Sequence, residues 1–210
     1  MNDSVELVQL WEGGPYWADR NIGAENPWDS GYYFWWGDTV GYKRANDKWV
    51  ASDGSNSDFR FEDSNTPTFD KSISELQREG WIAKNGVLAS EHDAAQKYLG
   101  GNWRMPTDEE FEELTDKCDW IWSMMNGVKG YVVRGRGDHA SQSIFLPSAG
   151  GGWEALLFDA GLCGSYWSAV PYSNYSDGAW YLDFSLSIHG RRCFCRSNGH
   201  SVRPLQGFIK

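Results

Sequence analysis

Two cysteines separated by one residue, Cys193 and Cys195, are the residues of this chain best suited to chemistry by type and spacing. With His189 or His200 they could contact a metal ion, but two thiols from one short segment fall short of a tetrahedral ligand set. The spacing is also too tight for an ordinary disulfide. The N-terminal residues do not read as an export signal, so we expect reduced thiols, no bound metal and no cofactor.

Four glutamates lie close together between residues 109 and 113, where paired carboxylates could serve acid–base catalysis. They follow Thr107, and Thr107 and Glu110 have the spacing of a capping box, in which each side chain bonds the other residue's backbone amide. Acidic side chains also favour the positive end of the helix dipole. The pattern therefore predicts a helix over 107–116 with a solvated acidic face, and we expect no catalytic residues and no enzyme.

The segment from Asp38 to Asp70 is polar and rich in acidic residues. Its carboxylates lack the ligand spacing of an EF-hand calcium loop. A solvated loop accounts for the charges more simply. We therefore interpret residues 38–70 as a long surface insertion that is ordered by Trp49, Phe59 and Phe61.

The elements that would position these residues are short. A second helix is predicted over 90–99, where Ser90 to Asp93 supply its start and Gly100-Gly101 its end. Asn126-Gly127 predicts a tight turn between two strands. The predicted strands cover residues 5–11, 16–22, 32–36, 120–125, 130–134, 143–146, 166–168, 180–185, 191–196 and 201–204. The sequence thus predicts an α+β protein, with two helices on small antiparallel sheets and long loops, in a single domain over 1–210.

Charge and composition limit the partners. The net charge is −10, which argues against nucleic acid or an anionic membrane as the main ligand. No apolar run approaches the roughly 18 residues of a transmembrane helix, so we expect no membrane insertion. The chain has 13 Trp, 10 Tyr and 10 Phe, which predicts an aromatic core.

The C-terminal part has a different composition from the rest. Lys, Glu, Gln, Met and Trp make up 42 of the 210 residues, but Ser168 to Leu205 contains only Trp180 of these types. Composition alone would place roughly seven or eight of them there. Sheets and turns also disfavour Lys, Glu and Gln, which is one explanation. The other is that every remaining residue type there is reached from an asparagine AAC codon by changing only its adenines. Such a segment would be a surface that differs from copy to copy.

Several motifs resemble a known family. Trp103 to Glu112 reads Trp-Arg-Met-Pro-Thr-Asp-Glu-Glu-Phe-Glu, which is similar to the R-[LM]-P-T-x-x-E-[WF]-E segment of formylglycine-generating-enzyme-like domains. Further blocks resemble that family or its bacterial major paralogous domain branch, in family order: 17–24, 32–38, 126–131, 144–147, 164–168 and 199–204. The resemblance spans about Leu10 to Leu205 and implies a variant C-type lectin fold.

Some members of that branch are variable proteins of diversity-generating retroelements, whose C-terminal segment is rewritten by an error-prone reverse transcriptase. The resemblance places such a region at about 166–204 here. Strand alternation predicts that Trp180, Leu182, Phe184 and Ile188 point inward. The residues predicted to be variable and ligand-binding are Ala169, Val170, Tyr172, Asn174, Tyr175, Asp177, Tyr181, Asp183, Ser185, His189, Arg191, Arg192, Cys193, Phe194, Cys195, Ser197 and Asn198.

The function predicted from this resemblance is binding of a protein or glycan ligand, on a phage particle or a bacterial cell surface. Tyr, Ser, Asn and Asp with Arg and Phe give the set the composition of an antibody-like binding surface. Two alternatives stay open. One is an oxidase like the parent family, which uses a copper-binding cysteine pair, although that pair is spaced by several residues. The other is an adhesive surface domain without variation.

Overall fold

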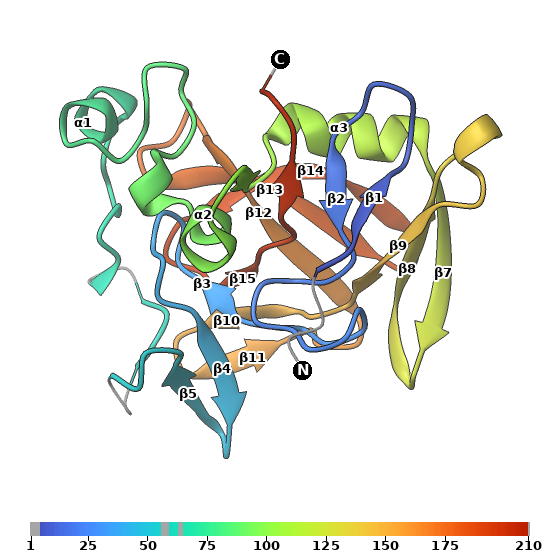
Figure 1. The fold of residues 1–210 in the computed structure, drawn as a ribbon. Helices are drawn as coiled ribbons and strands as arrows, with labels where there is room; N and C mark the ends of the chain where they lie inside the picture. The colour runs from blue at the N-terminus through green and yellow to red at the C-terminus, as the bar shows by residue number, and fades with distance from the viewer. Residues whose placement is uncertain (1–4, 56–58, 63–64, 210) are drawn as a thin grey trace.

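The computed structural model describes residues 5–55, 59–62 and 65–209, and it contains short helices packed on several small, largely antiparallel sheets (Figure 1). This arrangement confirms the predicted α+β class. None of the helices in the described ranges has the length and apolar character needed to cross a bilayer.

One seven-stranded sheet joins the two ends of the sequence. In its spatial order it consists of β14 (Ile188–Cys195), β13 (Gly178–Ser185), β12 (Cys163–Pro171), β15 (His200–Ser201), β3 (Tyr33–Phe34), β4 (Tyr42–Ala45) and β5 (Lys48–Ala51). Neighbouring strands are antiparallel except β12 and β15. The strands predicted at 166–168, 180–185 and 191–196 lie in this sheet, whereas the strand predicted at 201–204 contributes only Ser201.

Three smaller sheets flank it. The first contains β1 (Leu7–Gln9), β2 (Tyr16–Ala18), β16 (Leu205–Gln206) and β6 (Trp103–Arg104). The second contains β7 (Asp119–Met125), β8 (Val128–Arg134) and β9 (Ser143–Pro147), and the third contains β10 (Gly151–Trp153) and β11 (Leu156–Phe158). The β7–β8 turn is the predicted one, since Asn126 and Gly127 both have positive φ and Met125 pairs with Val128.

Both predicted helices are present. Helix α3 (Asp108–Lys117) begins at Thr107, whose side chain and that of Glu110 form the expected capping box. The predicted 90–99 helix divides into a 3₁₀ turn, η2 (Ser90–His92), and α2 (Ala94–Leu99), because Asp93 accepts hydrogen bonds from the first α2 amides. A further 3₁₀ turn is η3 (Gly137–His139).

A third helix, α1 (Ile73–Arg78), lies outside the prediction. Its own capping box, formed by Ser72 and Glu75, was present in the sequence and marks its start. The helix has only six residues, which is too short for an apolar stripe to stand out.

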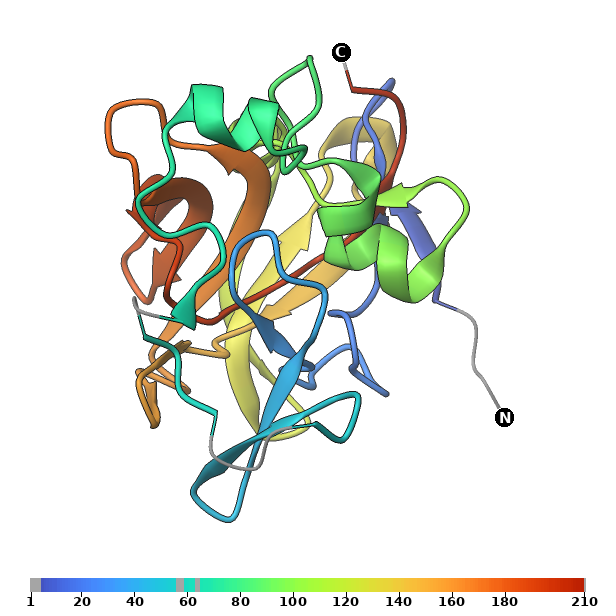
Figure 2. The ribbon, with the colours of Figure 1, turned by 90° about the vertical axis from the view of Figure 1, so that its left-hand side faces the viewer.

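The polar insertion is ordered by the aromatic residues expected to order it. Trp49, Phe59 and Phe61 are buried in one cluster with Tyr33 and Tyr42. The β4–β5 hairpin of the insertion projects from one end of the molecule in both views (Figure 1, Figure 2). Residues 56–58 and 63–64 of the insertion lie outside the described residues.

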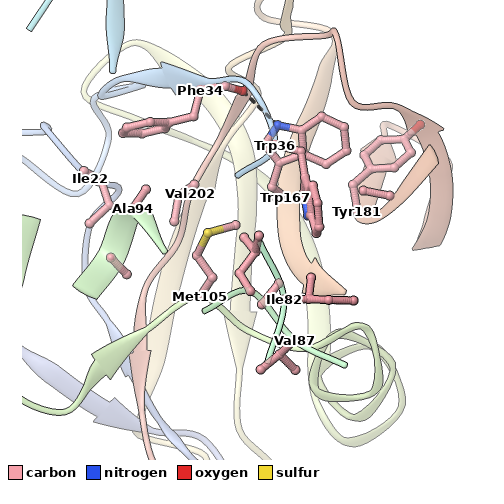
Figure 3. Packing of buried hydrophobic residues seen from close by; sticks show 14 of the residues in the cluster. Ile22, Phe34, Trp36, Ile82, Val87, Ala94, Met105, Trp167, Tyr181 and Val202 are labelled. Carbon is pink, nitrogen blue, oxygen red and sulfur yellow. Dashed lines mark hydrogen bonds between the residues drawn. The ribbon is translucent and has the colours of Figure 1, made fainter. Parts of the chain in front are cut away.

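The core around the segment predicted to be variable has two main clusters, one on each side of β12 and β13. Figure 3 shows the first, in which Trp36, Trp167 and Tyr181 pack with residues from the N-terminal half. The second lies under α3 and contains Leu182 and Phe184. The predicted region is therefore anchored by both faces of its central strand.

The block 199–204, which resembles the family, also belongs to the core. Arg203 is fully buried, and its guanidinium donates to the Asn21 side chain and to the carbonyls of Ala18, Asp19 and Phe145. A buried charge is tolerated when it is fully hydrogen-bonded, so Arg203 links β2 to β9 as part of the scaffold.

Candidate functional site

The β13–β14 hairpin divides its side chains between two faces. Cross-strand neighbours share a face, so Leu182 shares one with Arg191, and Tyr181 shares the other with Arg192. We call the first the α3 face, because Arg191 reaches α3 from it. We call the second the open face. It carries Asp183, Ile188, Arg192 and Phe194.

On the α3 face, two of the predicted variable residues are tied to the scaffold. Arg191 forms ion pairs with Asp108 at 2.6 Å and Glu112 at 3.0 Å, and its guanidinium lies 5.2 Å from the Trp180 ring centre. His189 stacks on Trp120 with 4.4 Å between ring centres. Partial burial lowers the pKa of His189, so the stack is made by a neutral ring near pH 7.

On the open face, Ile188, Arg192 and Phe194 of β14 are exposed. The Arg192 side chain is 56% exposed and pairs with Asp183 at 3.1 Å. Burial raises the pKa of Asp183, and the nearby Arg192 opposes that shift. Phe194 is 44% exposed although its ring contacts Tyr181 and His200. An exposed phenylalanine beside an arginine is the kind of side-chain pair that anchors protein interfaces.

An apolar cleft lies beside Phe194. It encloses about 380 Å³ and is lined by Trp153, Leu156, Phe158, Phe194, Cys195, Ser197 and Asn198. Trp153 and Leu156 flank the β10–β11 turn and are more than half exposed. Sequence reasoning missed both, since they precede the biased segment. The apolar run 156–158 next to the exposed Trp153 was the available signal.

A second cleft connects β14 with the β12–β13 loop. It encloses about 280 Å³ and is lined by Tyr175, Asp177, Gly178, Cys193, Phe194 and Cys195. Within the loop, the Asn174 amide donates to the Tyr172 hydroxyl and the Tyr172 ring lies 5.5 Å from that of Tyr175. The two clefts share Phe194 and Cys195, so the loop and strand candidates border one continuous area.

Several predictions of exposure are wrong. Ala169, Tyr181, Ser197 and Asn198 are buried. Ala169 and Tyr181 pack in the first core cluster, where Tyr181 lies near Trp167 (Figure 3). Ser197 and Asn198 lie in the turn that leads into β15, and the Ser197 carbonyl accepts a hydrogen bond from the buried Trp35 indole.

The predicted inward set is also wrong in part. Leu182 and Phe184 are fully buried, but Trp180 is only half-buried and Ile188 is exposed. Because the hairpin turn has two residues, Ser185 pairs with Ile188, and His189 pairs with Phe184. His189 therefore lies on the face of Phe184 in place of Ile188, but its side chain is exposed, as predicted. The other candidates, Val170, Tyr172, Asp177, Asp183, Ser185, Cys193 and Cys195, are half-buried.

The cysteines form no disulfide among the described residues, and Cys195 Sγ lies 3.6 Å from Asp177 Oδ2. Within residues 5–55, 59–62 and 65–209, no group of three or more His, Cys, Asp or Glu side chains is arranged to hold a metal ion.

Comparison with known proteins gives no match: no family model, curated protein or solved structure is similar to this chain. Its residues and their arrangement are therefore the basis for a functional assignment.

Proposed function

We propose that this protein binds a protein or glycan ligand through a C-terminal surface that is diversified by adenine mutagenesis of its gene. We propose further that its fold is the formylglycine-generating-enzyme type of C-type lectin fold. The observation that carries the proposal is the division of the biased segment's side chains between the surface and the core. Two of its exposed members, Tyr175 and Phe194, line two adjoining clefts, while Leu182 and Phe184 of the β13–β14 hairpin are buried.

Energetic separation of surface and core supports this function. Substitutions at solvent-facing sites usually change the free energy of unfolding by no more than about 0.5 kcal/mol. Asn174, Tyr175 and Arg192 are at such sites, and Phe194 is about half exposed. Many different sequences at these four positions are therefore compatible with one fold. The conserved architecture would come from the buried side chains and from Arg203.

The chemistry of the surface suits a macromolecular ligand. Phe194 and Tyr175 are aromatic anchors on the two clefts, and Trp153 adds a residue that adenine changes in an AAC codon cannot produce. A constant aromatic residue next to variable ones would give each copy a shared contact. Arg192 and Asn174 supply hydrogen bonds that can adapt to different partners.

Two matched libraries test the proposal. In the first, Asn174, Tyr175, Arg192 and Phe194 are encoded together by codons with a fixed third C. In the second, Tyr166, Leu182, Phe184 and Val202, all buried, are encoded in the same way. The fraction of members that resist protease on the surface of yeast is measured. We expect most of the first library and few of the second to fold.

Selection of the first library on a purified test protein, such as streptavidin, then measures its capacity for binding. Binders whose affinity depends on the four varied side chains are the expected result. If the first library folds no better than the second, or if it yields no binders, the proposed function is wrong.

A further inference from the structure

The strand β14 lies at the end of the seven-stranded sheet. It pairs with β13 along its full eight-residue length, from Ser185–Ile188 to Gly178–Cys195. On the other side of β14, no strand pairs with it among the described residues. β14 is thus a long, regular edge strand within the proposed variable surface.

The hairpin geometry determines which backbone groups face outward. Ser185 and Ile188 close a two-residue turn, so they form a hydrogen-bonded pair, and such pairs alternate with non-bonded ones along an antiparallel ladder. His189, Arg191 and Cys193 are therefore the residues whose N–H and C=O groups point away from β13. No described residue forms a hydrogen bond to these backbone groups from the outer side. The amide and carbonyl groups of His189, Arg191 and Cys193 thus form a regular row that an added strand could pair with.

Natural edge strands are usually blocked by proline, by bulges or by charges that point along the edge. β14 contains no proline and its register with β13 is continuous. Its Arg191 side chain is drawn toward α3 by Asp108 and Glu112. A Cβ built on Gly190 would meet no atom within 4 Å, so the open face has free space beside Asp183 for the side chains of an added strand.

We propose that the outer edge of β14 binds an extended segment of a protein ligand by strand addition. This inference rests on the proposed ligand-binding function and deepens it, because it assigns the ligand to the class of extended polypeptides. Strand addition gains affinity from main-chain hydrogen bonds and specificity from alternate side chains. The backbone row would be kept when the side chains of β14 vary, so every copy would retain one part of the contact.

The charges and apolar side chains of β14 define the segment that fits. Alternate side chains of an added strand would lie on the open face, beside Arg192 and Phe194. Acidic and apolar residues complement those two. A second copy of this chain fits less well, because antiparallel pairing of two β14 edges would place the arginines at 191 and 192 of both copies together. A glycan has no regular row of amide and carbonyl groups to pair with the edge.

Two substitutions at one position test the backbone contact. Cys193→Pro removes an outward N–H, whereas Cys193→Ser keeps it. Proline is tolerated on edge strands where its missing N–H faces solvent, so the ladder to β13 should persist. The probe is a displayed library of random linear 12-residue peptides selected on the unaltered protein. We expect enriched peptides to bind Cys193→Pro about tenfold more weakly than Cys193→Ser, which differs from it in keeping the outward N–H.

Failure to enrich any linear peptide, or equal binding to the proline and serine variants, overturns strand addition. If Cys193→Pro does not fold, as judged by near-UV circular dichroism, N-methylated versions of an enriched peptide replace it. N-methylation of the peptide backbone should weaken binding only at every second residue, where the N–H faces β14. Equal weakening at all residues, or none at any, would contradict the proposal. Selection of the codon library on streptavidin tests the ligand-binding function separately. Binders that are insensitive to Cys193→Pro would leave that function intact and remove strand addition.

Discussion

Two phenylalanines on neighbouring strands give a direct comparison of scaffold and surface. Phe184 on β13 is fully buried, and its ring lies 5.4 Å from Tyr131 and 5.8 Å from Tyr166. Phe194 on β14 is 44% exposed and lies 6.0 Å from both Tyr181 and His200. We expect Phe184→Ala to be far more destabilising than Phe194→Ala.

The magnitudes follow from burial. A fully buried phenylalanine replaced by alanine typically costs about 3–5 kcal/mol, since apolar contact is lost and a cavity remains. Phe184 fits that case. Only about half of the Phe194 side chain is buried, and the side chain lines two open clefts. Its removal therefore leaves no closed cavity. We expect a loss of about 1–2 kcal/mol for Phe194→Ala, at the level of its remaining apolar contacts.

Urea denaturation at pH 7.5, followed by tryptophan fluorescence, measures both values under the same conditions. Phe184→Leu is the control for packing volume, because it keeps an apolar side chain at the site. Equal losses for Phe184→Ala and Phe194→Ala would refute the separation of a rigid scaffold from a tolerant surface. A loss of more than about 3 kcal/mol for Phe194→Ala would show that the open face is part of the core.

Three further predictions concern charge and metal. Burial lowers the pKa of His200 to about 3, below its ordinary value of 6.5, so the unfolded chain binds the extra proton first and stability is lost as the pH falls from about 6.5 toward 3. Over that range, His200 should lower the free energy of unfolding by roughly 1.4 kcal/mol per pH unit. His200→Gln should reduce this pH dependence, measured by urea denaturation at several pH values. An unchanged slope of the free energy of unfolding against pH would contradict the prediction. Arg191→Ala should lower the free energy of unfolding by about 1–2 kcal/mol, because it leaves the largely buried Asp108 without its ion-pair partner. Arg192→Ala should lower it by less than about 1 kcal/mol, because the Arg192 side chain is largely exposed. A larger loss for Arg192→Ala than for Arg191→Ala would show that Arg192 is the structural arginine. Purified protein equilibrated with copper(I) should bind less than one equivalent, measured by mass spectrometry; stoichiometric copper lost on Cys193→Ser would favour the oxidase function.

Much of the architecture was accessible from local sequence patterns. The capping box of Thr107 and Glu110 and the turn at Asn126-Gly127 each carry their own geometry, and both predictions are confirmed. The aromatic residues expected to order the surface insertion are buried in one cluster. Local signals succeed where neighbouring residues alone determine the backbone conformation.

The two-sided burial of the hairpin was not accessible in the same way. Strand alternation gives the parity of side chains but not whether one or both faces are covered. Tyr181 shares its face with the exposed Arg192, and only the packing of Trp167 and His200 from other strands buries it. The parity also changes across the two-residue turn, which places His189 on the face of Phe184 and Ile188 on the open face, although both side chains are exposed.

The cleft beside Phe194 depends on contacts far apart in the sequence. Gly152 on β10 pairs with Gly199, which brings the β10–β11 hairpin next to the end of β14. A Cβ on Gly199 would clash with the Phe61 ring, so the close approach requires glycine there. No pattern within the C-terminal segment could have included Trp153 and Leu156 in the site.

Sequencing of the gene segment for residues 166–204 across a natural population tests the central claim most directly. We expect nonsynonymous differences to concentrate at the codons of exposed residues such as Asn174, Tyr175, Arg192 and Phe194. They should occur at the adenine positions of a nearby template copy. The codons of the buried Leu182 and Phe184 should be preserved. Variation spread evenly over buried and exposed codons, or confined to synonymous changes, would contradict it.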